Sequence, residues 1–537
     1  MSEDVFGIDL GTTYSAIAHM DEYGRPQIIQ NRDGQNTTPS VVYFESASNF
    51  VVGQEAKNGA RVYPDETVSL IKREMGEKNE RIFFDQPFYP ETISSLILKQ
   101  LVTEAQEATG STSSKVVITV PAYFGLGEKE STRQAGQIAG LDVVGILAEP
   151  VAAALSVGIT SAQDKCYFVY DLGGGTFDCT VLRVTQNAFE VVATDGNRKL
   201  GGADWDEALF DLVLSKFVQE SGIDDDPAAD PEFYQGLMND VETAKKTLSK
   251  KEKARLRCSY EGVQAVIFVT KEEFEAATRH LLNETLDIVQ RTLDAATSKV
   301  PGLNIDEVLL VGGSSRMPQV AEGLSSRFPW PLKNTEFDLA VAQGAAIYGS
   351  GVQPAVSDGG GSEGSAAPAG GGLPLLGSGQ EIVLDGRQVT FTNVLSKSVG
   401  VLFFDSDTKG DYIGFLAHAQ DKLPVHTTLT AATVEDHQTS VEIQLYEQSG
   451  EAESREVEHN KRITPEGVDP RITGLPDLPA GSPIELTLSI TNEGLASLHA
   501  VEPTSGHELT LEASLSTMQP EELEQARGIV SRMSISI

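Results

Sequence analysis

Two widely separated stretches of this chain follow the same pattern, and this internal similarity limits the folds available to it. Phe6–Thr13 (FGIDLGTT) and Val169–Thr176 (VYDLGGGT) are each an apolar run that ends in Asp-Leu-Gly and a turn of small residues. Each turn leads into a second apolar stretch, SAIAHM in one case and FDCTVLRV in the other. Short apolar runs on both sides of a glycine turn are typical of β-hairpins. The sequence therefore predicts two similar hairpins and an internal duplication.

The two predicted turns have the chemistry of a phosphate site. Glycines let backbone N–H groups approach phosphate oxygens, and an aspartate at a strand end can hold a water molecule of a bound Mg²⁺ ion. Two such hairpins that face each other would hold the β- and γ-phosphates of a nucleotide from both sides. One glycine turn alone is more often a structural turn, whereas the repeated pattern favours a nucleotide site.

A third segment, Val308–Arg316 (VLLVGGSSR), is again a predicted buried strand that opens into a glycine turn. Its arginine could stack on an adenine or contact a ribose, although a simple strand-to-helix turn would look the same. The sequence contains no GxxxxGK[ST] pattern, so a Walker-type nucleotide site is excluded.

Changes in composition and in hydrophobic periodicity divide the chain into four parts. Residues 1–350 alternate short apolar runs with helical patterns, which is typical of an α/β architecture. Residues 351–380 are rich in glycine and predict a flexible linker. Residues 381–518 alternate between apolar and polar residues and are interrupted by turns, which predicts a β-sandwich. Residues 519–537 predict one short helix, from Pro520 to Met533.

Charge and composition exclude several classes of partner. The chain has 41 Lys and Arg against 78 Asp and Glu, a net charge of −37, which disfavours nucleic acids and anionic membranes. Its three cysteines form no metal-binding or disulfide pattern. No segment approaches the ~18 apolar residues that span a bilayer, and the N-terminal residues lack the pattern of a leader peptide. We therefore expect a cytoplasmic location.

Eight motifs, in this order, resemble the nucleotide-binding domain of the 70-kDa heat-shock protein chaperones: GIDLGTTYS, IKREMG, ITVPAYF, ILAEPVAAAL, VYDLGGGTFD, LGGADWD, ETAKKTLS and VLLVGGSSRMP. The resemblance covers about Val5–Tyr348 and continues more weakly into the β-rich part. It implies an α/β actin-like ATPase domain, ribonuclease-H-like and duplicated, over residues 1–350, followed by a peptide-binding β-sandwich. It also implies ATP or ADP with Mg²⁺ as ligands, unfolded polypeptides as clients, and J-domain proteins and nucleotide exchange factors as co-chaperones.

The resemblance further implies a role for each matching residue. Lys72 would point at the γ-phosphate, and Asp9 and Asp171 would hold the hydrated Mg²⁺ ion. Glu149 and Asp178 would order the metal shell and the attacking water. Thr12, Thr13 and Thr176 would contact phosphate. The other implied nucleotide-binding residues are Gly11, Tyr14, Gly173, Gly174, Gly175, Gly201, Gly202, Glu242, Lys245, Lys246, Ser249, Gly312, Gly313, Ser314, Arg316 and Asp338.

The second half of the chain departs from the family pattern. The alignment places the peptide pocket at Val401, Phe403, Val441 and Ile443, although alternating strands would bury such residues in a core anyway. Where the family has a leucine-rich linker between aspartates, this chain has QVTFTN at Gln388–Asn393. The segment after Gly400 is longer than in the family, and one short helix stands in place of the family's long helical lid. We therefore expect weak coupling between the domains and fast exchange of bound peptide.

Two other functions are compatible with the same motifs. The chain could be an ATP-dependent scaffold or exchange partner for a full-length chaperone, with no client of its own. It could also be a small-molecule kinase on the same fold, although such an enzyme has no use for a β-sandwich.

Overall fold

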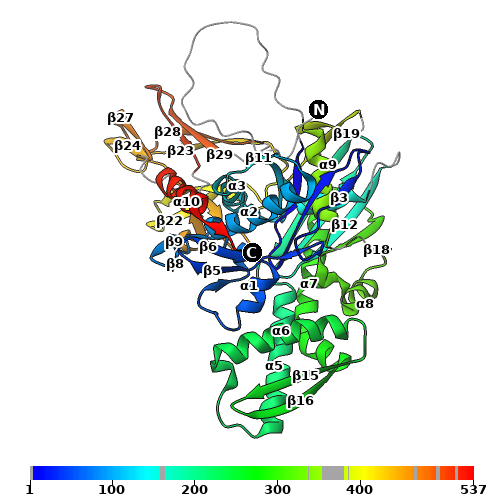
Figure 1. Cartoon of the computed structure of the whole chain (residues 1–537). Helices are drawn as coiled ribbons and strands as arrows, with labels where there is room; N and C mark the ends of the chain where they lie inside the picture. The colour runs from blue at the N-terminus through cyan, green and yellow to red at the C-terminus, as the bar shows by residue number, and fades with distance from the viewer. Residues whose placement is uncertain are drawn as a thin grey trace.

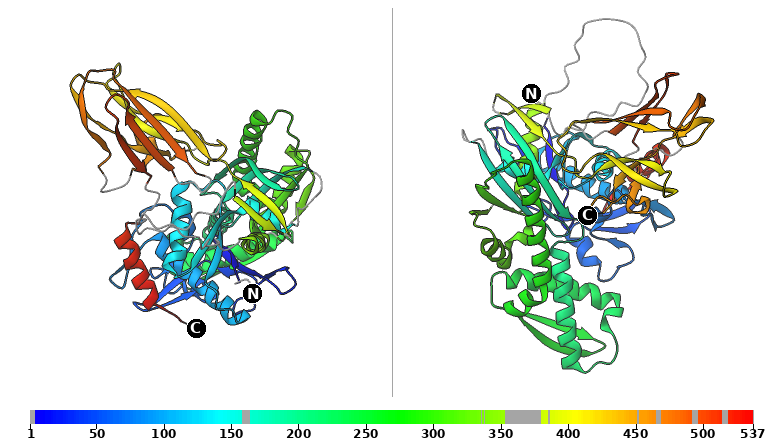
Figure 2. Two further views of the ribbon diagram at one scale, coloured as in Figure 1. Left: turned by 90° about the horizontal axis from the view of Figure 1, so that it is seen from above. Right: turned by 180° about the vertical axis from the view of Figure 1, so that it is seen from behind.

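The computed structural model shows two lobes and a β-sandwich packed beside them (Figures 1 and 2). The structure describes residues 4–157, 164–334, 336, 338–352, 380–384, 386–450, 452–464, 469–491, 496–513 and 518–536.

The first lobe is built on a sheet with the strand order β11-β10-β1-β2-β3, with β4 paired to β2. β1, β2 and β3 form an antiparallel meander, and β10 and β11 run parallel to β1. Helices α2 and α3 pack on this sheet in one buried apolar cluster. The bounds are β1 (Phe6–Asp9), β2 (Tyr14–Met20), β3 (Pro26–Ile28), β4 (Thr38–Pro39), β10 (Lys115–Val120), β11 (Asp142–Ala148), α2 (Pro90–Thr109) and α3 (Leu126–Ile138).

The second lobe repeats this arrangement. Its sheet has the order β18-β17-β12-β13-β14-β20-β19, in which β12, β13 and β14 form the meander and β17 and β18 run parallel to β12. The two predicted hairpins are therefore β1–β2 and β12–β13, and each occupies the same place in its sheet. The bounds are β12 (Lys165–Leu172), β13 (Phe177–Val184), β14 (Ala188–Asn197), β17 (Glu307–Val311) and β18 (Leu332–Asn334).

Two helices rich in small residues pack between the lobes, α4 (Glu149–Ser156) and α9 (Ala340–Gly351). A Cβ atom on Gly344 of α9 would lie 1.8 Å from the carbonyl oxygen of Ala152 in α4, and one on Gly7 of β1 would lie 2.1 Å from the nitrogen of Ala346. Glycine at both positions therefore lets the two lobes meet closely at the base of the cleft between them.

Each lobe carries a smaller extension beyond its sheet. In the first lobe, helix α1 and two small sheets form it; in the second lobe, helices α5, α6, α7 and α8 and the β15–β16 hairpin form it. The bounds are α1 (Gln54–Gly59), β5 (Val42–Ser46), β6 (Asn49–Val52), β7 (Thr67–Val68), the 3₁₀ turn η1 (Ile71–Glu74), β8 (Arg81–Phe83), β9 (Gln86–Phe88), α5 (Gly202–Ser221), η2 (Pro227–Ala229), α6 (Pro231–Leu248), β15 (Lys253–Tyr260), β16 (Val263–Thr270), α7 (Lys271–Lys299), η3 (Gly313–Arg316) and α8 (Pro318–Arg327).

The β-sandwich encloses an apolar core between sheets of order β22-β21-β25-β26 and β23-β28-β29-β30, with β24 and β27 as a separate pair. The bounds are β21 (Val399–Asp405), β22 (Gly410–Ala417), β23 (Val425–Ala432), β24 (Gln438–Glu442), β25 (Leu445–Gln448), η4 (Val457–His459), β26 (Asn460–Arg462), β27 (Arg471–Leu478), β28 (Pro483–Ile490), β29 (Ala496–Glu502) and β30 (His507–Glu512).

The structure corrects the predicted start of the sandwich at residue 381. Strands β19 (Gln380–Leu384) and β20 (Arg387–Thr392) form a hairpin that extends the sheet of the second lobe, because β20 pairs in parallel with β14. The apolar side chains of this hairpin pack on the lobe, where the ring of Phe391 stacks on that of Phe189 with a centroid distance of 5.2 Å. The predicted linker, residues 351–380, lies almost entirely outside the described residues.

The predicted C-terminal helix is α10 (Pro520–Arg532), followed by the short strand β31 (Ser534–Ile535). Both pack on the first lobe, where α10 lies beside α2 and α3 (Figure 1). Within the described part of the chain, each helix is too short or too polar to cross a lipid bilayer.

Candidate functional site

A cavity of about 710 Å³ lies in the cleft between the two lobes. Most of the residues implied to bind nucleotide line it. These are Asp9, Gly11, Thr12, Thr13, Tyr14, Lys72, Glu149, Asp171, Gly173, Gly174, Thr176, Gly202, Glu242, Lys245, Lys246, Ser249, Gly312, Gly313, Ser314, Arg316 and Asp338. Gly175, Gly201 and Asp178 are not part of the lining but adjoin it: Gly175 lies against Thr12, Gly201 lies against Thr176, and Asp178 is paired in register with Asp171.

The two Asp-Leu-Gly turns face each other at the base of this cavity. A Cβ atom on Gly174 would lie 1.8 Å from Thr13 Oγ1, and one on Gly175 would lie 2.1 Å from Thr12 Cγ2. These approaches are far inside van der Waals contact, so only glycine permits them. Among the described residues, Thr12 Oγ1 is buried without a hydrogen-bond partner. This oxygen fits a ligand that would complete its hydrogen bonding.

Four carboxyl groups gather at the ends of these strands, from Asp9, Asp171, Asp178 and Glu149. Burial, together with the nearby charge of Glu149, raises the pKa of Asp9 to about 7 and that of Asp171 well above its usual range. Burial also raises the pKa of Asp178 to about 8, although the Ala122 N–H donates a hydrogen bond of 2.6 Å to this carboxyl. These buried carboxyl groups outnumber the positive charges near them. Carboxylate oxygens are ligands that Mg²⁺ prefers, and the ion would also balance their negative charge.

Lys72 supplies a buried positive charge beside this cluster. Its Nζ donates to Glu149 Oε1 at 2.6 Å, and both side chains are almost fully buried. The residue sits in the η1 turn, and the neighbouring Arg73 donates to the carbonyl oxygen of Gly175 at 2.7 Å. The same arginine pairs with Asp204, whose carboxylate accepts from the Gly201 N–H at 2.6 Å. Through Arg73, the η1 turn of the first lobe therefore contacts the glycine turn of the second lobe.

The wall of the cavity on the α6 side is lined by polar and charged side chains that bond to one another. Glu242 accepts from the Tyr14 hydroxyl at 2.8 Å and from Lys246 at 2.7 Å, and it also pairs with Lys57, which comes from the other lobe. Burial alone would raise the pKa of Glu242, but Lys57 and Lys246 outweigh it and lower this pKa to about 2. Lys245 donates to the Gly202 carbonyl oxygen and to Asp206, both at 2.7 Å. These groups can contact a ribose and an adenine with both donors and acceptors.

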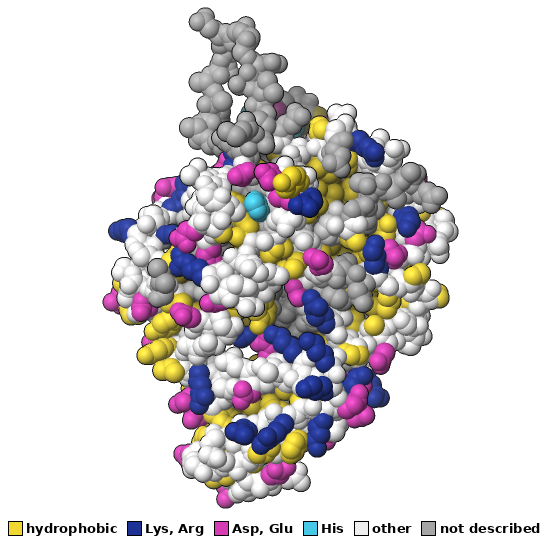
Figure 3. Space-filling model, turned by 45° about the vertical axis from the view of Figure 1, so that its right-hand side comes forward, with side chains coloured by type: hydrophobic (Ala, Val, Ile, Leu, Met, Phe, Trp, Pro, Cys, Tyr) yellow, Lys and Arg dark blue, Asp and Glu magenta, His cyan; other side chains and the backbone are white. Residues whose placement is uncertain are grey.

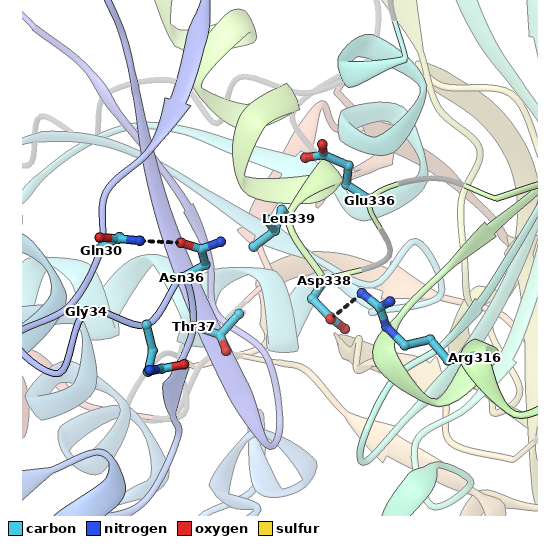
Figure 4. Close-up of a pocket in the computed structure, with 9 residues that line it drawn as sticks. Gln30, Gly34, Asn36, Thr37, Arg316, Glu336, Asp338 and Leu339 are labelled. Carbon is cyan, nitrogen blue, oxygen red and sulfur yellow. Dashed lines mark hydrogen bonds and ion pairs between the residues drawn. The ribbon is translucent and has the colours of Figure 1, made fainter. Parts of the chain in front are cut away.

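The opposite wall is formed by the η3 turn, which carries Ser314 and Arg316. Arg316 pairs with Asp338 at 2.8 Å, and both residues also line a second, adjacent cavity of about 550 Å³ (Figure 4). On its other side that cavity is lined by Gln30, Asn36 and Thr37 of the first lobe. The Arg316–Asp338 pair is therefore a shared wall between the two cavities.

Comparison with known proteins shows the family of this chain. The profile of the family described as "Hsp70 protein" matches residues 5–86, 79–359 and 378–532. The chain belongs to the Hsp70 family. "Chaperone protein DnaK" of Halobacterium salinarum is 35% identical over 538 residues, which cover 98% of this chain and 78% of that protein. "Chaperone protein DnaK" of Thermotoga petrophila is 34% identical over 522 residues, 95% of this chain and 80% of that protein.

Sequence reasoning on this Hsp70 chain missed several residues in the lining of the cavity or next to it. Asp206, which pairs with Lys245, lies inside the LGGADWD motif, so the motif contained a signal for it. Arg73 follows Lys72 directly in IKREMG and could have been found in the same way. Lys57 stands in no motif; only the fold brings it to Glu242 on the other lobe.

The four residues implied to form the peptide pocket of the Hsp70 sandwich lie in or against its core. Val401 and Ile443 are each 2% exposed, and Phe403 and Val441 pack against the same apolar cluster. The ring of Phe403 lies against Gly414, where a Cβ atom would be 2.6 Å from Phe403 Cε2. In this conformation the burial of these side chains favours the competing interpretation that they form the core.

The charge of the surface does not follow the net charge of the chain. Figure 3 shows one face of the molecule. On this face, Lys and Arg side chains gather over the extension of the second lobe that contains α5, α6, β15 and β16, at the bottom of the picture. The exposed residues in this part of the sequence include Lys250, Lys251, Lys253, Arg255 and Arg257. A negative nucleotide can therefore approach the cleft despite the net charge of −37.

Proposed function

We propose that this chain is an ATP-dependent chaperone, which binds and hydrolyses ATP with Mg²⁺ between its lobes and binds exposed apolar segments of unfolded proteins with its sandwich. One observation carries the proposal: the two Asp-Leu-Gly turns face each other over a buried carboxyl cluster and a paired lysine. Membership of a family of ATPase chaperones favours this activity over a small-molecule kinase.

The proposed nucleotide position follows from the chemistry of the two walls. Phosphates would lie between Thr12, Thr13 and the glycines that face them, where backbone N–H groups and hydroxyls can donate to phosphate oxygens. Adenosine would lie between Lys245 and Glu242 on one side and Arg316 on the other, where a planar guanidinium can stack on the base.

Hydrolysis of ATP needs mainly correct positions and neutralisation of charge. A Mg²⁺ ion held by Asp9 and Asp171 through water would offset the charge of the phosphates and of the carboxyls. Lys72 would place its ammonium group near the γ-phosphate, with Glu149 holding it in place at 2.6 Å. Asp178, which lies beside this cluster, would help to order the attacking water.

The other parts of the proposal rest on the family. Unfolded polypeptides are the proposed clients, J-domain proteins and nucleotide exchange factors are the proposed co-chaperones, and a cytoplasmic location is proposed with them. The four sandwich residues Val401, Phe403, Val441 and Ile443 would reach a peptide only after the sandwich rearranges, since two of them are buried in the core.

Replacing Lys72 by alanine tests the function most directly. We expect the variant to bind Mg²⁺ and ATP in calorimetry but to lose ATP turnover and the ATP-dependent protection of an unfolded client from aggregation. The exposed Arg279 offers a control, because Arg279→Ala removes one positive charge from α7, a helix that contributes no residue to the lining of the cavity. Parental turnover in Lys72→Ala would contradict the assigned role, and absence of ATP binding by the parent protein would contradict the proposed function.

A further inference from the structure

The nucleotide cavity is lined by one positive charge that the described residues do not balance. Six Lys and Arg side chains line this cavity. Five of them form ion pairs with carboxylates: Lys57, Lys72, Lys245, Lys246 and Arg316. The sixth, Lys250, is exposed and forms no ion pair within the part of the chain that the structure describes. Its ammonium group can therefore act on a charge that approaches from solvent.

Lys250 also begins a row of positive charges that leads away from the cavity. It follows Ser249, the residue that caps the end of α6, and the chain then enters β15. Residues 250–257 contain five Lys and Arg and one acidic residue, Glu252. We name the five exposed cations the basic patch: Lys250, Lys251, Lys253, Arg255 and Arg257. They belong to the part of the surface where Figure 3 shows Lys and Arg side chains together.

The strand sets the spacing of the patch. In β15 the exposed Lys253, Arg255 and Arg257 alternate with residues that are buried in the core of the second lobe. Neighbouring cations are therefore on one face and roughly 6.7 Å apart, which is the rise of two strand residues. Seven residues separate Lys250 from Arg257, so the patch extends roughly 25 Å at most from the cavity.

The neighbouring strand does not balance these charges. Arg255 is paired in register with Phe268 of β16, and Arg257 with Val266, both of which are exposed and apolar. The ammonium group of Lys253 lies over the ring of Phe268, 4.1 Å from its centroid. This cation–π contact holds Lys253 in place with a neutral partner, so its charge stays available to solvent.

Acidic groups lie at the far end of the same hairpin. Partial burial, and then the charges of Glu261 and Asp225, raise the pKa of Tyr260, the last residue of β15. The positive part of the hairpin is therefore the part next to the cavity, and the negative part lies beyond it. An anion near this lobe is attracted to the side from which the cavity is entered.

Charge complementarity identifies the ligand of the patch. ATP and ADP are anions, and the chain as a whole, with a net charge of −37, repels them. We propose that the basic patch steers nucleotides into the cavity, so that an approaching nucleotide first meets the patch and then reaches the binding residues past Lys250. The four cations beyond Lys250 do not line the cavity, so they should raise the association rate of nucleotides and leave dissociation and turnover unchanged. This proposal deepens the proposed function and rests on it.

Two double variants with the same net charge test the steering on the full chain. Arg255→Glu with Arg257→Glu reverses the outer part of the patch. Arg387→Glu with Arg462→Glu makes the same change at exposed positions of β20 and β26, strands that contribute no residue to the lining of the cavity. Association and dissociation of a fluorescent ATP analogue with Mg²⁺ are measured by stopped flow, at about 0.01 M and about 1 M NaCl, where the screening length is roughly 30 and 3 Å.

At the lower salt concentration we expect the patch variant to associate with the analogue about threefold more slowly than the parent, or slower still. The control should stay within about 1.5-fold of the parent, and at about 1 M NaCl the three rates should converge. Dissociation rates and kcat should be parental in both variants. If the patch variant does not fold, Arg255→Gln with Arg257→Gln removes the charges without reversing them, against Arg387→Gln with Arg462→Gln as its control.

Three results would overturn the steering. A parental association rate in the patch variant would leave the patch to a macromolecular partner. An equal loss in variant and control would show that only the net charge matters. Faster dissociation from the patch variant would show that these arginines contact the bound nucleotide. A parent protein that binds no ATP in calorimetry refutes the proposed function instead, whereas normal binding with association independent of the patch refutes the steering alone.

Discussion

Replacing Gly174 by alanine probes the geometry on which the nucleotide site depends. A Cβ atom there would lie 1.8 Å from Thr13 Oγ1 and 2.6 Å from Thr13 Cβ, whereas carbon atoms in contact are normally about 3.5–4.0 Å apart. Rotation of the Thr13 side chain does not move its Cβ, so the two turns would have to separate by roughly 1 Å. A misplacement of this size in an active site costs about 100-fold in rate, or about 2.7 kcal/mol.

The assay is steady-state ATP hydrolysis, with kcat/KM and thermal unfolding measured on the same preparations. Gly528→Ala in α10 is the matched control, because no atom lies within 4 Å of its added Cβ. It should keep the parental kcat/KM and gain roughly 0.5–1 kcal/mol of stability, since alanine is the better helix former. A folded Gly174→Ala variant with parental kcat/KM would refute the inference that the two turns grip the phosphates between them.

Two further predictions concern pH and salt. Because burial raises the pKa of Asp9 to about 7, its carboxyl carries a proton below that pH which a metal must displace. Mg²⁺ affinity should therefore rise by up to about tenfold per pH unit between pH 5 and 7, and an affinity independent of pH in titration calorimetry would contradict this. The net charge of −37 creates self-repulsion in the folded state, so the melting temperature should rise with NaCl as screening increases. A melting temperature that is flat or falls between 0.1 and 1 M NaCl, roughly the range over which the screening length drops from about 10 to 3 Å, would show that repulsion is not limiting.

Most residues of the candidate site could be predicted from the sequence because local rules select them. Glycine is the only residue type that fits at Gly174 and Gly175, opposite Thr13 and Thr12. The turns therefore leave a clear pattern in the sequence. Asp9 is the last residue of its strand and Asp171 is the last but one of its strand, so both come just before such turns. A motif of this kind places its own side chains, whichever fold surrounds it.

Residues that act through the fold left a weaker signal. Lys57 meets Glu242 only because α1 of the first lobe faces α6 of the second across the cleft. Likewise, the alternation in Val401, Phe403, Val441 and Ile443 predicts strands, but alternation alone does not say which face is buried in a core and which could meet a peptide. The structure places two of these side chains in the core.

The sequence by itself determined the duplicated hairpins, the strand-rich second half and the helix near the C-terminus, because hydrophobic periodicity and glycine turns act over a few residues. Only the tertiary structure decided where two of these pieces attach. The alternating residues of β20 would suit the edge of many sheets, and they join the second lobe because Phe189 and Tyr348 provide an apolar surface there. The apolar face of α10 predicted a helix, but its partner on the first lobe is set by residues hundreds of positions away, such as Lys99. Burial and strand pairing depend on surfaces that exist only after the lobes have folded, so no local pattern could have assigned either attachment.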